Sequence, residues 1–234
     1  MLFQSAREHV VELCLELSRR GYFAGTGGNL MLRIDAEHVA VTPSATDYLE
    51  MGPADVAVLR LGDLGRVAGE RAPSVETSLH ARVLRARPEV GCSIHTHQPV
   101  ASACALLGEP LVVPPPWQAS LGERVPLVGY APSGSAWLAA RLAAALRPGL
   151  NAYLMRNHGI LCCGTDSGAA LQAVDDLEAL ARQHLAERIA ERIAESARFD
   201  HRLHLHRVID ALLAPAQPET TDQVPAALPP QAHV

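Results

Sequence analysis

The segment 91–97, GCSIHTH, constrains the fold of this chain most, because a short apolar run there carries two histidines one residue apart. A short apolar run of this kind is typical of a buried strand. Successive side chains of a strand point to opposite faces, so His95 and His97 project together, about 7 Å apart along the strand. The chain is therefore expected to build a sheet that carries two imidazoles on one of its buried strands.

Helical and strand-like patterns alternate along the rest of the chain. Helical patterns cover 5–20, 76–87, 100–108, 133–147, 168–197 and 200–213. Strand-like patterns cover 30–34, 39–44, a hairpin over 56–67, 125–131, and two strands in 152–164 that join at 157–159. The segment 111–118, LVVPPPWQ, is expected to be extended because its prolines exclude a helix. This order predicts mixed α and β structure in one domain.

Length and composition narrow the class of protein. The 234 residues suit one domain over 1–214, followed by a flexible proline-rich tail over 215–234. A net charge of −5 argues against nucleic-acid binding. No apolar run is long enough to cross a bilayer, and the N-terminus does not read as a signal peptide, so a cytoplasmic enzyme is expected. The five cysteines form no CxxC motif and are expected to be reduced, buried thiols.

The histidine pair suggests a metal site. Neutral imidazole is a good zinc ligand, and a catalytic zinc site needs three protein ligands and an open position. An H-x-H pair alone fits two hydrogen-bonded structural histidines equally well. His158, in the segment RNHGI, follows an apolar strand pattern at a place where loops carry function. It is the candidate for the third ligand, although a histidine there can also be an ordinary turn residue.

Glu76 stands at the start of the predicted helix 76–87, where the helix dipole favours a carboxylate. It is either a plain helix-start residue or a general base held near the metal. His80, one turn later, is a possible partner of the site or an ordinary core residue. Three turn-like pieces, 26–29 (TGGN), 42–45 (TPSA) and 73–74 (PS), offer backbone N–H groups and hydroxyls that suit an anion. Combined with a metal triad they suggest a phosphorylated substrate.

Five pieces, GTGGNL, VTPSATDYL, PSVETSLHARVLRARPEV, IHTH and RNHGI, occur in this order between residues 25 and 160. The ordered set resembles the class II aldolase/adducin family, and the likeness runs over most of residues 5–200. The resemblance implies a three-layer α/β/α single domain with a largely antiparallel central sheet. It also implies a homotetramer with its sites at the subunit interfaces.

The same resemblance implies one zinc ion per subunit, bound by His95, His97 and His158. Glu76 would match the family's acid/base residue, which can also occupy the fourth position of the metal. Substrate- and phosphate-binding positions of the family match Gly28, Asn29, Ser44, Ala45, Ser74 and Val75. The implied reaction is the cleavage of a small phosphorylated ketose to dihydroxyacetone phosphate and an aldehyde, through a zinc-stabilised enediolate with Glu76 moving the proton.

Departures from the family pattern keep other activities open. The segment 114–122, PPPWQASLG, has no tyrosine where family aldolases have one, and residues 201–234 contain none either. Val75 replaces a hydroxyl residue and Ala45 a glycine. The alternatives are a decarboxylase, dehydratase or epimerase acting on a related sugar phosphate or oxo-acid phosphate, or a non-catalytic adducin-like module. A metallohydrolase is disfavoured because Gln98 and Pro99 interrupt its usual ligand pattern.

Overall fold

The computed structural model describes residues 1–23, 26–195 and 199–214, so the predicted tail 215–234 lies outside the described residues. The helices are α1 (Gln4–Arg19), α2 (Thr77–Ala86), α3 (Pro99–Leu107), α4 (Pro115–Leu121), α5 (Ala136–Ala145), α6 (Ser167–Glu195) and α7 (Phe199–Leu213). The strands are β1 (Asn29–Arg33), β2 (His38–Val41), β3 (Ala57–Arg60), β4 (Arg66–Ala68), β5 (Cys92–Thr96), β6 (Leu111–Val112), β7 (Arg124–Val125), β8 (Leu127–Val128), β9 (Ala152–Met155) and β10 (Gly159–Gly164).

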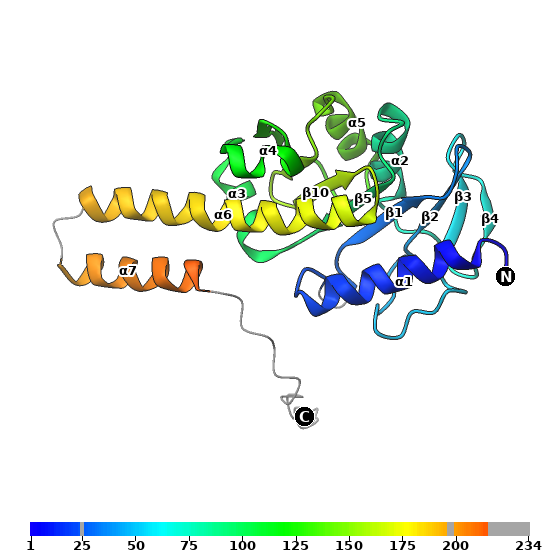
Figure 1. The fold of residues 1–234 in the computed structure, drawn as a ribbon, viewed down its shortest axis with the longest axis horizontal. Coiled ribbons are helices and arrows are strands. Elements are labelled where there is room, and N and C mark those ends of the chain that lie inside the picture. Colours follow the sequence, from blue (N-terminus) through cyan, green and yellow to red (C-terminus); the bar gives the residue numbers. More distant parts are fainter. Residues whose placement is uncertain (24–25, 196–198, 215–234) are drawn as a thin grey trace, which may run out of the picture.

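Eight of these strands form one sheet in the order β4-β3-β2-β1-β5-β10-β9-β8, and β6 pairs with β7 separately. Only the pair β8–β9 is parallel within the described sheet. Helices cover both of its faces (Figure 1). One apolar core lies between the sheet and α1, α3 and α6, and a second lies between the sheet and α2 and α5. The predicted three-layer α/β/α fold with a largely antiparallel sheet is confirmed.

The strand β5 positions the histidine pair at the centre of the sheet, between β1 and β10. All five of its residues are buried because both faces are covered. Cys92 and Ile94 pack into the core with α1, α3 and α6. Ser93 contacts His80 of α2 on the opposite face. His95, two residues after Ser93, therefore belongs to the α2 face.

Two expectations about proline-containing segments are wrong in detail. The segment 111–118 is not extended throughout, because α4 begins at Pro115 with prolines in its first turn. Proline suits this position, since its φ angle is already helical and its missing N–H would have no partner there. The expected strand over 125–131 is divided at Pro126, so that β7 pairs with β6 whereas β8 pairs with β9.

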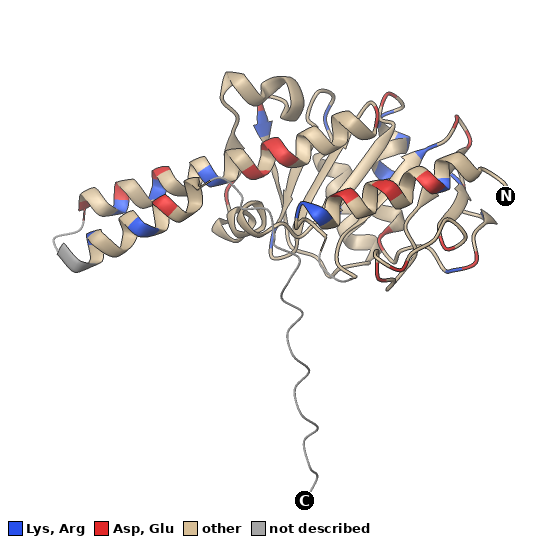
Figure 2. Cartoon of the chain, turned by 60° about the horizontal axis from the view of Figure 1, so that its bottom comes forward, with Lys and Arg blue, Asp and Glu red and all other residues tan. Residues whose placement is uncertain are grey.

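The C-terminal part of α6 extends beyond the α/β body and packs against α7 as a helical hairpin (Figure 1). Figure 2 shows charges of both signs interspersed along α1, α6 and α7. Across the described residues no helix combines the length and apolar character that a membrane crossing requires. The five cysteines are free and buried, as expected.

Candidate metal centre

The structure brings His95, His97 and His158 together from two separate parts of the chain. His95 lies on β5, His97 follows the end of that strand, and His158 lies in the turn between β9 and β10. The turn places Asn157 in the left-handed region, with φ 55°. One ligand nitrogen from each ring lies within 4.8 Å of the other two. Such a cluster can hold one metal ion.

The tautomer of His95 follows from its hydrogen bond to the backbone. Its Nδ1 lies 2.6 Å from the Ile160 carbonyl oxygen, which can only accept, so Nδ1 carries the proton. Its buried Nε2 then presents a lone pair and has no hydrogen-bond partner among the described residues. Burial lowers the pKa of His95 to about 3, against the opposing effect of Glu76, so the ring stays neutral. A neutral imidazole with its Nε2 lone pair unused fits a divalent metal ion.

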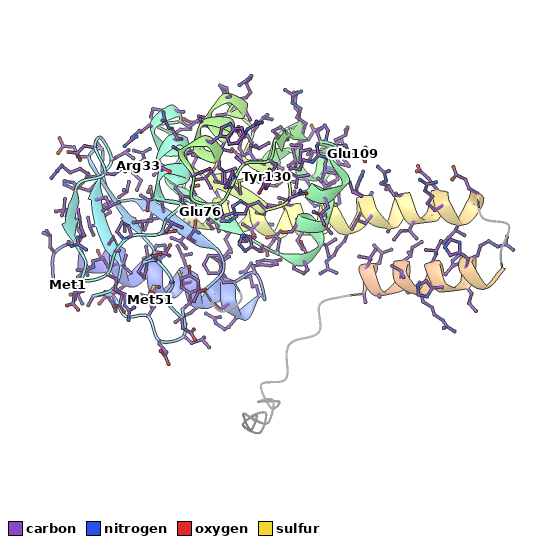
Figure 3. All side chains as sticks on the ribbon, turned by 180° about the vertical axis from the view of Figure 1, so that it is seen from behind. Met1, Arg33, Met51, Glu76, Glu109 and Tyr130 are labelled. Atoms are coloured by element: carbon purple, nitrogen blue, oxygen red, sulfur yellow. The ribbon has the colours of Figure 1, made fainter. Side chains whose placement is uncertain are left out.

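Glu76 lies beside this lone pair, inside the α/β body and away from the α6–α7 hairpin (Figure 3). It is the N-cap residue of α2 and is 4% exposed. Its Oε2 lies 3.2 Å from His95 Nε2, and its Oε1 lies 3.2 Å from His158 Nε2. Two lone pairs cannot share the Oε2–Nε2 contact favourably, and a cation among them would relieve this repulsion.

The carboxylate of Glu76 also accepts two side-chain hydrogen bonds. Asn29 Nδ2 donates to Oε2 at 2.9 Å, and Ser133 Oγ donates to Oε1 at 2.9 Å. Burial alone would raise the pKa of Glu76. The hydrogen bond with His158, the nearby His95 and the amide of Asn29 outweigh burial and hold this pKa well below its usual range. Glu76 is therefore ionised and can accept a proton.

Ser133 is a contact that sequence reasoning missed. It lies in the exposed loop between β8 and α5, far from Glu76 in the sequence. The PSGS turn there carries no pattern that points to a carboxylate. His97 and Ser133 are exposed whereas His95 is buried, so one side of the site faces solvent. The hydroxyl of Ser133 contacts Glu76 from that side.

The predicted substrate residues lie around the same centre. Asn29 begins β1 and pairs in register with His95. Gly28 before it has φ +83°, and a Cβ there would lie 2.4 Å from the ring of Phe23. Only glycine suits both conditions. This tight approach brings the start of β1 against the end of β5.

The two remaining loops with predicted substrate residues lie side by side. A β-bridge joins Pro43 to Pro73, and the N–H of Ser74 donates to the Thr42 carbonyl at 2.9 Å. Ser44 and Ala45 thus lie near Ser74 and Val75, which lead directly into Glu76. Ala45 adopts a left-handed conformation with φ 49°, a backbone conformation that glycine adopts at less cost. Val75 is 66% exposed at the edge of the site.

Comparison with known proteins agrees with this geometry. The family model "Class II Aldolase and Adducin N-terminal domain" matches residues 8–185. A 5-methylthioribulose-1-phosphate/5-deoxyribulose-1-phosphate aldolase of Rhodospirillum rubrum is 31% identical over 179 residues, which cover 76% of this chain and 79% of the relative. A methylthioribulose-1-phosphate dehydratase of Serratia proteamaculans is 30% identical over 195 residues, which cover 78% and 95%.

A solved structure of an L-fuculose 1-phosphate aldolase superposes with a TM-score of 0.73 at 27% identity, covering 87% of this chain and 96% of that one. The family match spans most of the chain, and the fold agrees with it. The chain therefore belongs to the class II aldolase and adducin family, and it is an enzyme of the family's aldolase type, a lyase.

Proposed function

We propose that this protein is a zinc-dependent aldolase that cleaves a small phosphorylated ketose to dihydroxyacetone phosphate and an aldehyde. The observation that carries the proposal is the convergence of three imidazoles and one ionised carboxylate, with the buried Nε2 of His95 lacking a hydrogen-bond partner among the described residues. Structural histidines normally find hydrogen-bond partners when they are buried. A lone pair left free inside the fold favours a ligand role.

His95, His97 and His158 would hold the metal, and Glu76 would lie at its fourth position until substrate arrives. When bound, zinc would supply a Lewis acid for the carbonyl and hydroxyl oxygens of the substrate and for the enediolate that forms on cleavage. Glu76 would move the proton at the reacting carbon, because its carboxylate is ionised and held in place by Asn29 and Ser133.

The phosphate group of the substrate would bind between the two adjacent loops that follow β2 and precede α2. Backbone N–H groups and serine hydroxyls there suit an anion that carries several acceptor oxygens. The residues assigned to substrate and phosphate are Gly28, Asn29, Ser44, Ala45, Ser74 and Val75. Because Val75 replaces a hydroxyl residue of the family pattern, this proposed phosphate site has one hydrogen-bond donor fewer.

The names of the relatives favour a ketose 1-phosphate whose far end is apolar, such as a methylthio or deoxy pentulose phosphate. One of them is a dehydratase, and the tyrosine expected in family aldolases is missing from 114–122. Loss of water from the same substrate class is therefore the second candidate function. A non-catalytic module is disfavoured because the metal triad and Glu76 are all present.

The protein is further proposed to be a cytoplasmic homotetramer, with a domain over 1–214 and a tail over 215–234. Sedimentation equilibrium of the full-length chain would test this assembly. A monomer at micromolar concentration would contradict it, because family sites of this kind lie at subunit interfaces.

The function is tested by metal analysis and a substrate panel. Purified protein should contain about one zinc per chain, and a His95→Ala/His97→Ala variant should lose it. Glu76→Gln should keep most of the metal and the melting temperature but lower kcat by a factor of about 10² to 10⁴. Ketose 1-phosphates and oxo-acid phosphates are offered, and dihydroxyacetone phosphate, carbon dioxide and dehydrated product are measured separately. Full activity in metal-free protein would refute the site.

A further inference from the structure

A buried chain of hydrogen bonds leads from β5 to the carboxylate of Glu76. Ser93 Oγ lies 2.8 Å from His80 Nδ1, and His80 Nε2 lies 2.6 Å from Asn29 Oδ1. Asn29 Nδ2 donates to Glu76 Oε2 at 2.9 Å. His80 and Ser93 are fully buried, and Asn29 is 7% exposed. Three elements of the fold, the helix α2 and the neighbouring strands β1 and β5, therefore meet in one line of polar contacts.

The direction of this chain follows from the chemistry of its end. An ionised carboxylate only accepts hydrogen bonds, so the NH₂ group of Asn29 faces Glu76 and its Oδ1 faces His80. The amide oxygen also only accepts, so the proton of His80 lies on Nε2. A neutral ring then accepts at Nδ1, and the hydroxyl of Ser93 donates to it. Once the carboxylate is ionised, the donor and the acceptor of every hydrogen bond from Ser93 to Glu76 are therefore fixed.

The two oxygens of Glu76 consequently have different surroundings. Oε2 is anchored by the buried amide of Asn29. Oε1 accepts from the hydroxyl of Ser133, which lies in an exposed loop, and lies 3.2 Å from His158 Nε2. A carboxylate held at one oxygen by a fixed donor keeps its plane while the other oxygen exchanges a proton.

We propose that His80 is a positioning residue that locks the amide of Asn29, so that Glu76 is held at Oε2 and left with Oε1 for proton transfer. The kinetic part of this inference rests on the proposed function, whereas the direction of the chain does not. Without His80 the amide loses the donor that holds its oxygen and can turn. Glu76 then loses its anchor although His95, His97 and His158 are untouched.

The direction of the chain is tested in the metal-free, full-length protein labelled with ¹⁵N-histidine. Long-range ¹H–¹⁵N correlation spectra report which ring nitrogen carries the proton, and the His80 signal is assigned by its loss in His80→Gln. The expected result is a single Nε2–H tautomer at neutral pH. An Nδ1–H tautomer or a mixture would reverse the chain and overturn the proposal.

The effect on catalysis is tested by three variants. His80→Leu should retain zinc but lower kcat about 10- to 100-fold, with KM changed less than about threefold. His80→Gln, whose amide N–H can reach Asn29, should recover at least about tenfold of that loss. Leu84→Ala on the same helix is the matched control, because Leu84 is 1% exposed and belongs to the apolar core. It should lose stability and keep kcat.

The outcomes separate this inference from the proposed function. An unchanged kcat in His80→Leu, a His80→Gln variant no better than His80→Leu, or an equal kcat loss in Leu84→Ala overturns the positioning role. If His80→Leu does not fold, Ser93→Ala takes its place with an expected loss of about threefold or more, and an unchanged kcat again overturns it. If the wild-type protein is inactive on every substrate, the proposed function is wrong. The His80 tautomer measured by NMR then tests the direction of the hydrogen-bonded chain independently.

Discussion

Two buried imidazoles, those of His80 and His95, are neutral because neither ring is exposed to solvent. Burial lowers the pKa of His80 to about 4 and that of His95 to about 3, and in both cases Glu76 opposes the shift. An ordinary histidine has a pKa near 6.5. Both the metal-ligand role and the hydrogen-bonded chain require neutral rings. The lowered pKa values of these two histidines therefore make the stability of the fold depend on pH.

The first prediction concerns the stability of the metal-free protein in acid. Between pH 6.5 and about 4 the unfolded chain protonates His80 whereas the folded chain does not. The contribution of neutral His80 to the free energy of unfolding is therefore fully present above pH 6.5 and is lost as the pH falls toward 4. The loss is on the order of 2 kcal/mol by pH 4.5, and His80→Gln does not undergo it.

Urea unfolding with a chelator at pH 7 and pH 4.5 measures this difference for both proteins. His80→Gln should start from a lower or similar stability at pH 7 and should decline less on acidification. Equal declines in the two proteins would show that His80 is protonated in the folded state.

At the scale of elements, the helix α3 depends on a residue of α6. The helix begins directly after the metal-site segment, and its N-cap residue Gln98 makes no capping hydrogen bond with its side chain. The backbone N–H groups of Val100 and Ala101 donate instead to the buried carboxylate of Glu178, at 3.2 and 2.9 Å. A carboxylate at a helix N-terminus also interacts favourably with the helix dipole. The capping group thus comes from 77 or more residues away.

The second prediction is that Glu178→Ala lowers the free energy of unfolding by about 2 kcal/mol, because two buried N–H groups lose their acceptor. Glu178→Gln is the matched control, since its amide oxygen still accepts one of these bonds, and it should cost about half as much. Urea denaturation of both variants measures the difference. A change below about 0.5 kcal/mol in Glu178→Ala would mean that water replaces the cap.

At the scale of the whole molecule, the strand order creates the site. The central strands β1, β5 and β10 are neighbours, so the start of β1, the end of β5 and the turn before β10 meet at the same end of these strands. The helix α2 then places Glu76 over this end from the face that also carries His95. These segments lie far apart along the chain, and their meeting depends on long-range pairing.

The third prediction concerns the segment beyond this body. Truncation after Ala214 should leave the melting temperature within about 2 °C of the full-length value, because residues 215–234 are rich in proline and lack an apolar period. Differential scanning calorimetry of the two chains measures this. A drop of several degrees would show that the tail docks on the domain.

Several features could be predicted from local pattern alone. The helix over 76–87 and the turn at 157–159 follow from short-range propensity, and the structure confirms both as α2 and the β9–β10 connection. Pro115 shows the limit of such reasoning, because a proline forbids the interior of a helix but suits its first turn. Which of the two applies depends on how the flanking chain is held, and the local sequence does not contain that information.

By itself the sequence predicted that His95 and His97 project together, from the two-residue repeat of a strand. In the structure β5 ends at Thr96, and His97 joins the cluster from just beyond the strand. It also indicated the family, because the motifs and their order along the chain can be recognised in the sequence alone. Only the tertiary structure decided that Nε2 of His95 has no hydrogen-bond partner among the described residues, that Ser133 reaches Glu76, and that His80 lies within hydrogen-bond distance of Asn29. These contacts join segments by strand register and layer packing, which arise from the whole chain and leave no signature in any one stretch of it.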